Sequence, residues 1–193
     1  MNVAGLILAA GESRRMGSPK ALLQYRTETF LDTLTALLAP RCASVIVVLG
    51  AHAADIRAAV TRPATFVVNP DYALGMTTSL QCGLRAVPQD ADAVLFTLVD
   101  HPAASPATLD ALLAPMDNQS LVRVPRYRAK RGHPIWFSRA LISEFLALPS
   151  DGPARDVVAR HVDRTAYLDL DDPGIVADID SPEDYRTLLG ARA

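Results

Sequence analysis

The chain has 193 residues, of which 50% are hydrophobic and 21% are charged, so it is long enough to bury the core of one domain. Its formal net charge of −2 excludes a broad basic surface for nucleic acid, and a phosphate-bearing ligand would have to be held by a few well-placed cations. No stretch approaches the ~20 apolar residues of a membrane helix, and the N-terminus has no basic leader, so we expect a cytoplasmic protein that does not bind membranes.

Short apolar runs alternate with amphipathic stretches along the first 115 residues. Runs at residues 3–9, 45–49, 65–68 and 93–99 are typical of strands buried on both faces. Helical spacing follows them near residues 30–38, 52–60, 80–87 and 105–113. Thr27 or Thr29 is available as an N-cap, and Ser105 before Pro106 opens a helix in the preferred way. This alternation predicts an α/β fold with a mostly parallel, Rossmann-like, doubly wound sheet.

The second half of the chain is less regular. Apolar clusters occur at residues 121–124, 135–137 and 141–146, and the spacing of Ser181 and Asp184 predicts a capping box on a final helix. We find no repeat, no low-complexity tract and no linker long enough to divide the chain. A single domain over residues 1–193 is therefore expected.

Two cysteines, Cys42 and Cys82, lie far apart in the sequence. Their spacing fits neither a zinc site nor a disulfide-rich secreted domain. We predict two buried thiols, with a redox or substrate role as the alternative.

The segment from Leu8 to Lys20 joins small residues to two cations at the end of the first predicted strand. It lacks the G-x-G-x-x-G spacing, and Pro19 stands where the Walker pattern requires glycine. Small residues at positions 9–11 would let backbone amides approach a ligand, and Arg15 with Lys20 would neutralise phosphate groups. The alternative is a tight turn whose cations are solvated. The carboxyl end of a strand in an open α/β sheet favours the ligand-binding interpretation.

This segment resembles the A-A-G-x-S-x-R-M-G-x-x-K signature of nucleotidyltransferases with the glycosyltransferase-A-like fold. It is most similar to the molybdenum cofactor cytidylyltransferases and their relatives. The matching residues are Ala9, Ala10, Gly11, Ser13, Arg15, Met16, Gly17 and Lys20. Residues 69–72, 75–80, 98–102, 132–134 and 178–184 resemble further segments of the same family. The resemblance implies a three-layer α/β/α fold of the nucleotide-diphospho-sugar transferase type.

The resemblance also implies that two parts of the chain have different roles. Residues from about 1 to 115 would bind the nucleotide, and residues from about 116 to 193 would bind the acceptor and carry a C-terminal metal motif. Catalysis would depend on Arg15, Lys20 and Asp100. The implied nucleotide-binding residues are Leu8, Ala9, Ala10, Gly11, Ser13, Arg15, Lys20 and Ser79.

A nucleotidyl transfer brings two anionic groups together, so a divalent cation is expected. Mg²⁺ binds through one or two carboxylates and the phosphates. In the family, the aspartate at the position of Asp100 binds the metal; capping of the next loop is the alternative role. Asp178 and Asp180 alternate along an extended segment and so point to the same face. By analogy with relatives, we favour Asp180 over Asp178 as the second ligand.

Base choice would depend on Ser79 and Ala10. Ser79 resembles the polar residue that contacts the base in cytidylyl relatives, and a helix N-cap is its alternative role. The guanylyltransferases resemble a Gly-Gly form of the first loop, so the methyl group of Ala10 would shrink the base pocket and disfavour a purine. One methyl group discriminates by only ~1–3 kcal/mol. These residues favour CTP over GTP.

The acceptor side carries the one dense basic run, at Arg123, Arg126, Arg128, Lys130 and Arg131. It is either a solvated face or a site for the terminal phosphate of molybdopterin. It precedes Gly132 and His133, which resemble the acceptor-side loop of the family. We take Gly132, His133 and His101 as acceptor-binding residues, with His133 as a brace of its own loop as the alternative.

The sequence therefore predicts transfer of CMP from CTP to the molybdenum cofactor, with Mg²⁺ as cofactor and release of pyrophosphate. One alternative keeps the enzyme class but uses GTP, or a sugar or alditol phosphate as acceptor. Another is a carrier or chaperone for a finished nucleotide cofactor. A molybdoenzyme or its chaperone is a possible protein partner.

Overall fold

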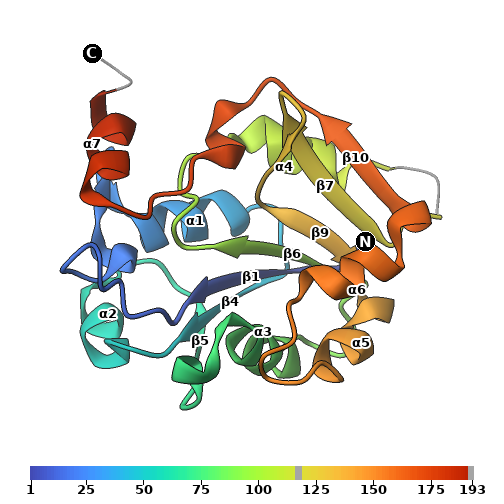
Figure 1. Ribbon diagram of the computed structural model, residues 1–193, viewed down its shortest axis with the longest axis horizontal. Coiled ribbons are helices and arrows are strands. Elements are labelled where there is room, and N and C mark those ends of the chain that lie inside the picture. Colours follow the sequence, from blue (N-terminus) through green and yellow to red (C-terminus); the bar gives the residue numbers. More distant parts are fainter. Residues whose placement is uncertain (116–118, 191–193) are drawn as a thin grey trace.

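The computed structural model describes residues 1–115 and 119–190, and within them the main sheet has eight strands (Figure 1). Their order is β10-β7-β9-β6-β1-β4-β5, with β8 paired to β7. The strands are β1 (Val3–Ala9), β4 (Ser44–Leu49), β5 (Thr65–Val68), β6 (Ala93–Leu98), β7 (Val122–Tyr127), β8 (Lys130–Arg131), β9 (Ile135–Ser138) and β10 (Thr165–Asp169). A separate hairpin consists of β2 (Gln24–Tyr25) and β3 (Glu28–Thr29).

Helices cover both faces of the sheet, which confirms the predicted three-layer α/β/α architecture. They are α1 (Phe30–Leu38), α2 (Ala53–Ala59), α3 (Met76–Arg85), α4 (Pro106–Leu113), α5 (Ile142–Leu146), α6 (Arg155–Arg160) and α7 (Pro182–Gly190). Figure 1 shows α1 and α4 on one side of the sheet and α3, α5 and α6 on the other. Within the described residues, no helix has the length and apolar character needed to cross a membrane.

Two hydrophobic cores arise from the alternation of side chains along β1. Val3, Ile7 and Ala9 pack with residues of α1, α2 and α4. Leu6 and Leu8 pack on the opposite face with residues of α3, α5 and α6. Because β1 is buried on both faces, its sequence is a continuous apolar run rather than an alternating one.

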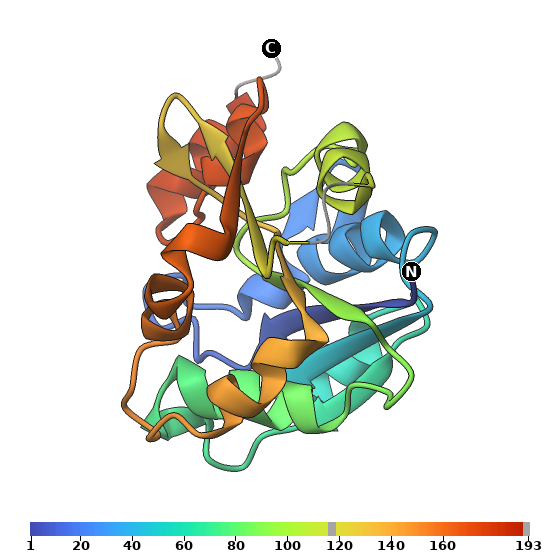
Figure 2. The same cartoon turned by 90° about the vertical axis from the view of Figure 1, so that its right-hand side faces the viewer.

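The strand order places a topological switch point between β1 and β6. From β1 the chain moves outward through β4 and β5, and it then returns to pair β6 with the other edge of β1, all in parallel. The connections after β1 and β6 therefore diverge at their carboxyl ends, which is where open α/β sheets bind ligands. Beyond β6 the sheet is mixed: β9 runs antiparallel to β6 and β7, and β10 pairs in parallel with β7. Figure 2 shows this end of the sheet, where the β7–β8 hairpin projects.

The predicted strands and helices of the first 115 residues are confirmed, together with two of their caps. Thr29, not Thr27, caps α1 and accepts a hydrogen bond from the Asp32 amide at 3.0 Å. Ser105 caps α4, with Pro106 in its first turn. The expected boundary between the nucleotide and acceptor parts falls at residues 116–118, which lie outside the described residues.

Among the strands and α-helices, β8, β10, α6 and the β2–β3 hairpin were not predicted from the sequence. The strand β10 is mostly half-buried at the edge of the sheet, and its sequence Thr-Ala-Tyr-Leu-Asp holds only three consecutive apolar residues. Its position depends on pairing with β7, which local periodicity does not reveal.

Both cysteines are free and half-buried, so they are less buried than predicted. Burial, which outweighs the nearby Arg41, raises the pKa of the Cys42 thiol to about 12. Burial also raises the pKa of Cys82. Because the thiolate is the reactive form, both thiols are poor nucleophiles at neutral pH.

Helix α3 lies so close to the sheet that glycine is required at one of its positions. A Cβ atom at Gly83 would lie 2.5 Å from Leu6 Cδ1 and 2.7 Å from Val48 Cγ2. Both side chains are fully buried and have no space into which to move. This close approach sets the height of α3 above the carboxyl ends of β1 and β4.

We predict that Gly83→Ala lowers the free energy of unfolding by ~1–3 kcal/mol, because the added methyl group overpacks the core. Gly190→Ala is the matched control, since a Cβ atom at this last residue of α7 would have no neighbour within 4 Å. Urea denaturation followed by circular dichroism measures both. Equal stability of the two variants would show that α3 can move away from the sheet.

Candidate functional site

The loop after β1 folds back on itself and is closed by a side chain. Ser13 has a positive φ of 54°, and its hydroxyl group accepts a hydrogen bond from the Lys20 amide at 2.9 Å. Gly17 supplies a second positive φ, of 69°. Within the described residues, the amides of Gly11 and Glu12 donate to no protein group, so they are available to phosphate oxygens. Ser13 therefore helps to fix the conformation of the loop that contains it.

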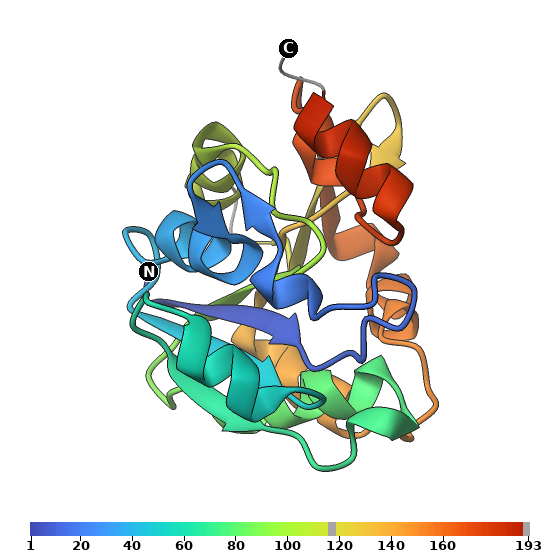
Figure 3. The same ribbon diagram turned by 90° about the vertical axis from the view of Figure 1, so that its left-hand side faces the viewer.

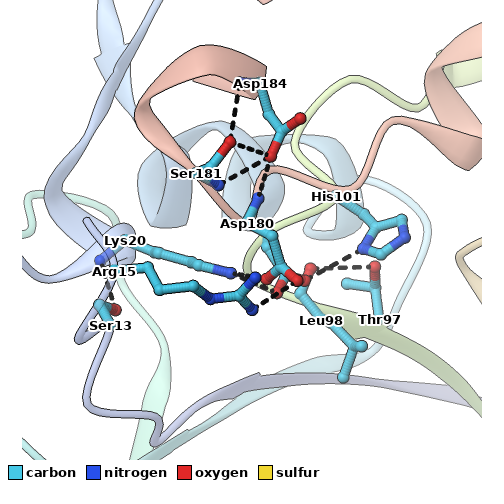
Figure 4. A network of polar contacts seen from close by, with 10 residues as sticks. Ser13, Arg15, Lys20, Thr97, Leu98, His101, Asp180, Ser181 and Asp184 are labelled. Carbon is cyan, nitrogen blue, oxygen red and sulfur yellow. Dashed lines mark hydrogen bonds and ion pairs between the residues drawn. The ribbon is translucent and has the colours of Figure 1, made fainter.

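Lys20 connects two carboxylates from distant parts of the chain (Figure 4). Its Nζ lies 3.0 Å from Asp100 Oδ2 and 2.6 Å from Asp180 Oδ1, with only 12% of its side chain exposed. Arg15 adds a second cation, with Nη2 at 2.7 Å from Asp180 Oδ2. The three predicted catalytic residues and Asp180 thus form one ion-pair network at the carboxyl ends of β1 and β6.

The network shifts the pKa of its members. Burial disfavours the charged form of Asp100, but the hydrogen bond from His101 and the charge of Lys20 outweigh it, and its pKa falls to about 2. Burial opposes the charge of Lys20 too, yet the hydrogen bond to Asp180 and the charge of Asp100 raise its pKa. The hydrogen bond from Lys20 lowers the pKa of Asp180 despite some burial. All three groups are charged at neutral pH.

The C-terminal segment is held against the end of β6 by backbone contacts and a helix cap. The Ile179 amide donates to the carbonyl oxygen of Asp100 at 3.0 Å, which fixes the next residue, Asp180, beside it. The capping box of α7 is confirmed: Ser181 Oγ accepts from the Asp184 amide, and Asp184 Oδ2 accepts from the Ser181 amide. Figures 1 and 3 show the start of α7 beside the loop after β1.

The two candidates for the second metal ligand face different cavities. Among the described residues, Asp100, His101 and Asp178 form a group of possible metal ligands whose atoms lie within 4.8 Å of one another. Burial and the charge of Asp100 raise the pKa of Asp178. Asp178 lines a cavity of about 910 Å³ near α1 and α7, whereas Asp180 and Asp100 line the cavity at the loop after β1. Carboxylate oxygens are the donors that Mg²⁺ prefers, so these residues fit a hard divalent cation.

A cavity of about 350 Å³ opens at the loop after β1, and all the predicted nucleotide-binding residues line it. These residues are Leu8, Ala9, Ala10, Gly11, Ser13, Arg15, Lys20 and Ser79. We refer to it as the nucleotide cavity. Its lining also includes Tyr72 and Met76, which the sequence did not single out within their motif.

One wall of the nucleotide cavity depends on a second close approach. A Cβ atom at Gly50, just after β4, would lie 2.6 Å from both the Ala10 carbonyl oxygen and Tyr72 Cβ. The next amide, that of Ala51, donates to the same carbonyl oxygen at 3.1 Å. The loop after β1 and the turn at Tyr72 therefore meet over a residue with no side chain.

Ser79 lies inside α3 and is not its N-cap, so that alternative role is wrong. The helix begins at Met76, and Gly75, with φ 128°, occupies the cap position. Ser79 is 4% exposed, and its Oγ accepts a hydrogen bond from Asn69 Nδ2 at 3.0 Å. Ser79 lines the nucleotide cavity, and this hydrogen bond holds its hydroxyl group in place.

A second cavity, of about 670 Å³, adjoins the first and shares Met76 and Leu98 with it. Apolar and aromatic side chains of β6, β7, β9, α5 and α6 line most of it. The predicted acceptor residues Gly132 and His133 line this acceptor cavity. His101 is not among the described residues that line either cavity. Instead, its Nδ1 lies 3.1 Å from Asp100 Oδ1, where it supports that carboxylate.

Gly132 and His133 also hold their own loop. A Cβ atom at Gly132 would lie 2.4 Å from the Ile175 carbonyl oxygen, and the His133 amide donates to that oxygen at 2.9 Å. The His133 ring lies between Phe96 and His101, with centroids 5.6 Å and 4.8 Å away. Burial and the charge of His101 lower the pKa of His133 to about 3, so the ring is neutral at pH 7.

The basic run does not form one patch. Arg123 is 6% exposed and donates to the carbonyl oxygens of Leu112 and Ala114, so it cannot reach a ligand, and its inclusion in a phosphate site is wrong. Arg126 pairs with Asp169 at 2.7 Å. Arg131 lines the acceptor cavity. Arg123 and Arg126 point to opposite faces because side chains alternate along β7, whereas Arg131 lies on β8.

Comparison with known proteins gives consistent matches over nearly the whole chain. A family model described as the MobA-like NTP transferase domain matches residues 5–165. The chain is 27% identical over 186 residues to the molybdenum cofactor cytidylyltransferase of Escherichia coli (strain K12), with 94% of this chain and 93% of that protein covered. It is 31% identical over 192 residues to the purine catabolism protein PucB of Bacillus subtilis (strain 168), with 94% and 93% covered.

Solved structures confirm the fold. Rv0371c from Mycobacterium tuberculosis H37Rv has a TM-score of 0.84 at 30% identity, with 98% of both chains covered. Its complex with manganese has a TM-score of 0.77 at 31% identity, again with 98% of both chains covered. Molybdopterin-guanine dinucleotide biosynthesis protein A from Archaeoglobus fulgidus has a TM-score of 0.72 at 14% identity, with 96% of both chains covered, which shows the fold alone. The fold is of the nucleotide-diphospho-sugar transferase type, as predicted.

The lowered pKa of His133 predicts a loss of stability in mild acid. Below its usual pKa of 6.5 the unfolded chain binds a proton at this residue, whereas the folded chain does not do so until about pH 3. Stability therefore falls as the pH drops through 6.5, by about 1 kcal/mol between pH 7.5 and 5.5. We expect His133→Gln to lose less over this range in urea denaturation with a chelator present. An equal loss in both proteins would contradict a neutral, buried His133.

Proposed function

The chain belongs to the family of MobA-like NTP transferase domains, and from this premise we propose that it transfers CMP from CTP to the molybdenum cofactor and releases pyrophosphate. The observation that carries the proposal is the nucleotide cavity, where every predicted nucleotide-binding residue lies beside the Lys20 network. The chain is a nucleotidyltransferase, as its named relatives are. The choice of CTP and the identity of the acceptor are proposals.

Phosphate recognition would use the cations that the carboxylates now hold. The side chain of Arg15 is 69% exposed and can turn toward the outer phosphates at little cost. Lys20 is mostly buried, so its ammonium group stays close to the α-phosphate side of the cavity. Both cations then face charge that increases during the reaction, where a fixed cation is worth several kcal/mol of the barrier.

The attack itself needs no general base. A terminal phosphate of the acceptor is already ionised at pH 7, and one of its oxygens attacks the α-phosphorus of CTP while the bond to the pyrophosphate oxygen breaks. What the protein must do is align the two anions and offset their repulsion. The two cavities share Met76 and Leu98, and this adjacency supports such an alignment.

We propose Asp100 and Asp180 as the residues that would hold Mg²⁺. Asp180 is preferred to Asp178 because it faces the nucleotide cavity, and a cation that neutralises phosphates must face them. When bound, the metal supplies charge neutralisation at the phosphates. The related Rv0371c structure with manganese supports a divalent cation in proteins of this kind.

The acceptor cavity supports a substrate with a flat apolar body and an anionic end. Its walls include Phe96, Phe137 and Tyr167, which suit a fused ring system, and Arg131 supplies a cation. A molybdopterin has this combination of ring and phosphate. A sugar or alditol phosphate would leave most of the apolar lining in contact with hydroxyl groups, which is unfavourable.

Transfer of GMP from GTP is the second candidate. Curated relatives named probable molybdenum cofactor guanylyltransferase match 58% of the chain at 34–35% identity. Against it stands Ala10, which is 5% exposed and lines the nucleotide cavity where a purine needs space. A carrier without catalysis is disfavoured because it has less need of Asp100 and Lys20.

The test is to incubate the protein with each of the four nucleoside triphosphates and Mg²⁺, with and without molybdenum cofactor, and to measure pyrophosphate. We expect release only with CTP and the cofactor together. Ala10→Gly should narrow the ratio of kcat/KM for CTP over GTP by admitting GTP, with little loss on CTP, because one methyl group is worth ~10–200-fold. A wild-type preference for GTP would overturn the choice of nucleotide.

The variant Lys20→Ala tests whether pyrophosphate release depends on this site. We expect at least ~10²-fold lower turnover in a folded protein, because a cation facing the reacting phosphate is lost. Near-normal turnover in this variant would place the reaction elsewhere.

For the metal, we predict that Asp100→Asn nearly abolishes turnover and that Asp180→Asn costs more than Asp178→Asn. Asp180→Asn should also raise the Mg²⁺ concentration that gives the half-maximal rate, because one ligand charge is lost. Initial rates of pyrophosphate release over a series of MgCl₂ concentrations measure both effects. If Asp178→Asn is the more damaging variant, the group of Asp100, His101 and Asp178 is the metal site instead.

A further inference from the structure

We propose that Asn69 is a positioning residue that fixes the direction of the Ser79 hydroxyl group, so that the nucleotide cavity presents a hydrogen-bond donor to the base. The inference rests on the proposed function, because it assumes that a nucleotide base lies against Ser79. The inference predicts that the cavity discriminates between bases of equal size. The methyl group of Ala10 acts only through size and cannot explain such discrimination.

The orientation of the Asn69 side-chain amide is determined by the backbone. Asn69 directly follows β5, is 3% exposed, and its own amide donates to the Leu49 carbonyl oxygen at 2.8 Å. Its side-chain Oδ1 accepts from the Asp71 amide at 3.0 Å. A backbone N–H can only donate, so the oxygen of the side chain must lie on this side and the nitrogen on the other.

The nitrogen of Asn69 faces two hydroxyl groups of α3. Its Nδ2 donates to Thr78 Oγ1 and to Ser79 Oγ, both at 3.0 Å. Thr78 has backbone acceptors for its own proton, at the carbonyl oxygens of Asp71 (2.9 Å) and Gly75 (2.8 Å). Thr78 is thus satisfied within the protein both as donor and as acceptor.

Ser79 differs from Thr78 in this respect. Its Oγ accepts from Asn69, and within the described residues it makes no other hydrogen bond. The proton of a hydroxyl group that accepts from one side turns away from that side. Because Ser79 lines the nucleotide cavity, this proton is the group that a base would meet.

A hydroxyl donor selects a base edge that accepts. The ring nitrogen N3 of cytosine carries no proton and accepts, whereas N3 of uracil carries a proton and would face the donor. The two pyrimidines have the same size and both accept at O2, so a hydroxyl group at Ser79 discriminates between them by its direction where it meets N3. A site built around a hydrogen bond rejects the wrong partner strongly, because its buried polar group is left unpaired.

The conservative variant Asn69→Asp reverses the hydroxyl group. The carboxylate can still accept from the Asp71 amide, but its other oxygen accepts where Asn69 Nδ2 donates. The Ser79 proton then turns toward residue 69, and a lone pair faces the cavity. A lone pair accepts from N3–H of uracil and repels N3 of cytosine, so the preference between the two bases should weaken or invert.

The experiment measures kcat/KM with CTP and with UTP, and the Kd of each nucleotide, for wild type, Asn69→Asp, Asn69→Ala and Ser79→Ala. We expect the CTP/UTP ratio to fall roughly 100-fold in Asn69→Asp and roughly 10-fold in Asn69→Ala, where the hydroxyl group rotates freely. In a Ser79→Ala background, Asn69→Asp should leave the ratio unchanged. Thr78→Val is the matched control: it removes the other partner of Asn69, so it should lower Tm but not the ratio.

A purely structural Asn69 would lower activity with both nucleotides by the same factor. An unchanged CTP/UTP ratio in Asn69→Asp, or a shift that persists in the Ser79→Ala background, would overturn the inference. If Asn69→Asp does not fold, the ratio in Asn69→Ala decides in the same way. Failure of the proposed function gives a different result, namely a wild-type protein that does not turn over CTP with the acceptor.

Discussion

The ammonium group of Lys20 is the contact on which the rest of the site depends. It holds together the carboxylates of Asp100 and Asp180, and the latter lies 160 positions away in the sequence. Two carboxylates that contact the same ammonium group would repel each other without it, and this mostly buried cation removes the repulsion. The two cations and two carboxylates of the network balance in charge, so a phosphate or metal that binds there exchanges one ionic partner for another without creating an isolated buried charge.

The fold supplies this contact through three segments that meet at one end of the sheet. The parallel pairing of β1 with β6 places the loop after β1 beside Asp100. The backbone bond from Ile179 to Asp100 then brings in the C-terminal segment, and the cap of α7 holds it. Together, the strand pairing, the backbone hydrogen bond and the helix cap determine the position of Asp180. The strands beyond β6 add the wall of the acceptor cavity to this arrangement.

Much of this could be predicted from the sequence, because the signals are local. A continuous apolar run identifies β1, capping chemistry identifies Thr29 and Ser105, and a contiguous motif identifies the residues that line the nucleotide cavity. What could not be predicted depends on packing between distant segments. Arg123 belongs to a basic run in the sequence, yet its side chain donates to backbone carbonyl groups at the end of α4. Asp178 and Asp180 alternate alike, yet they line different cavities.

The glycine after β4 has a consequence for how base preference can change in this protein. Gly50 lets the Ala10 carbonyl oxygen and Tyr72 meet, and any side chain there would push the walls of the nucleotide cavity apart. A combinatorial library that randomises this cavity should recover glycine at position 50 in every active clone, whichever nucleotide is used for selection. The productive diversity lies at positions 10, 76 and 79, whose side chains line the cavity. Base preference can therefore change through a small set of side chains, while the backbone at Gly50 stays the same.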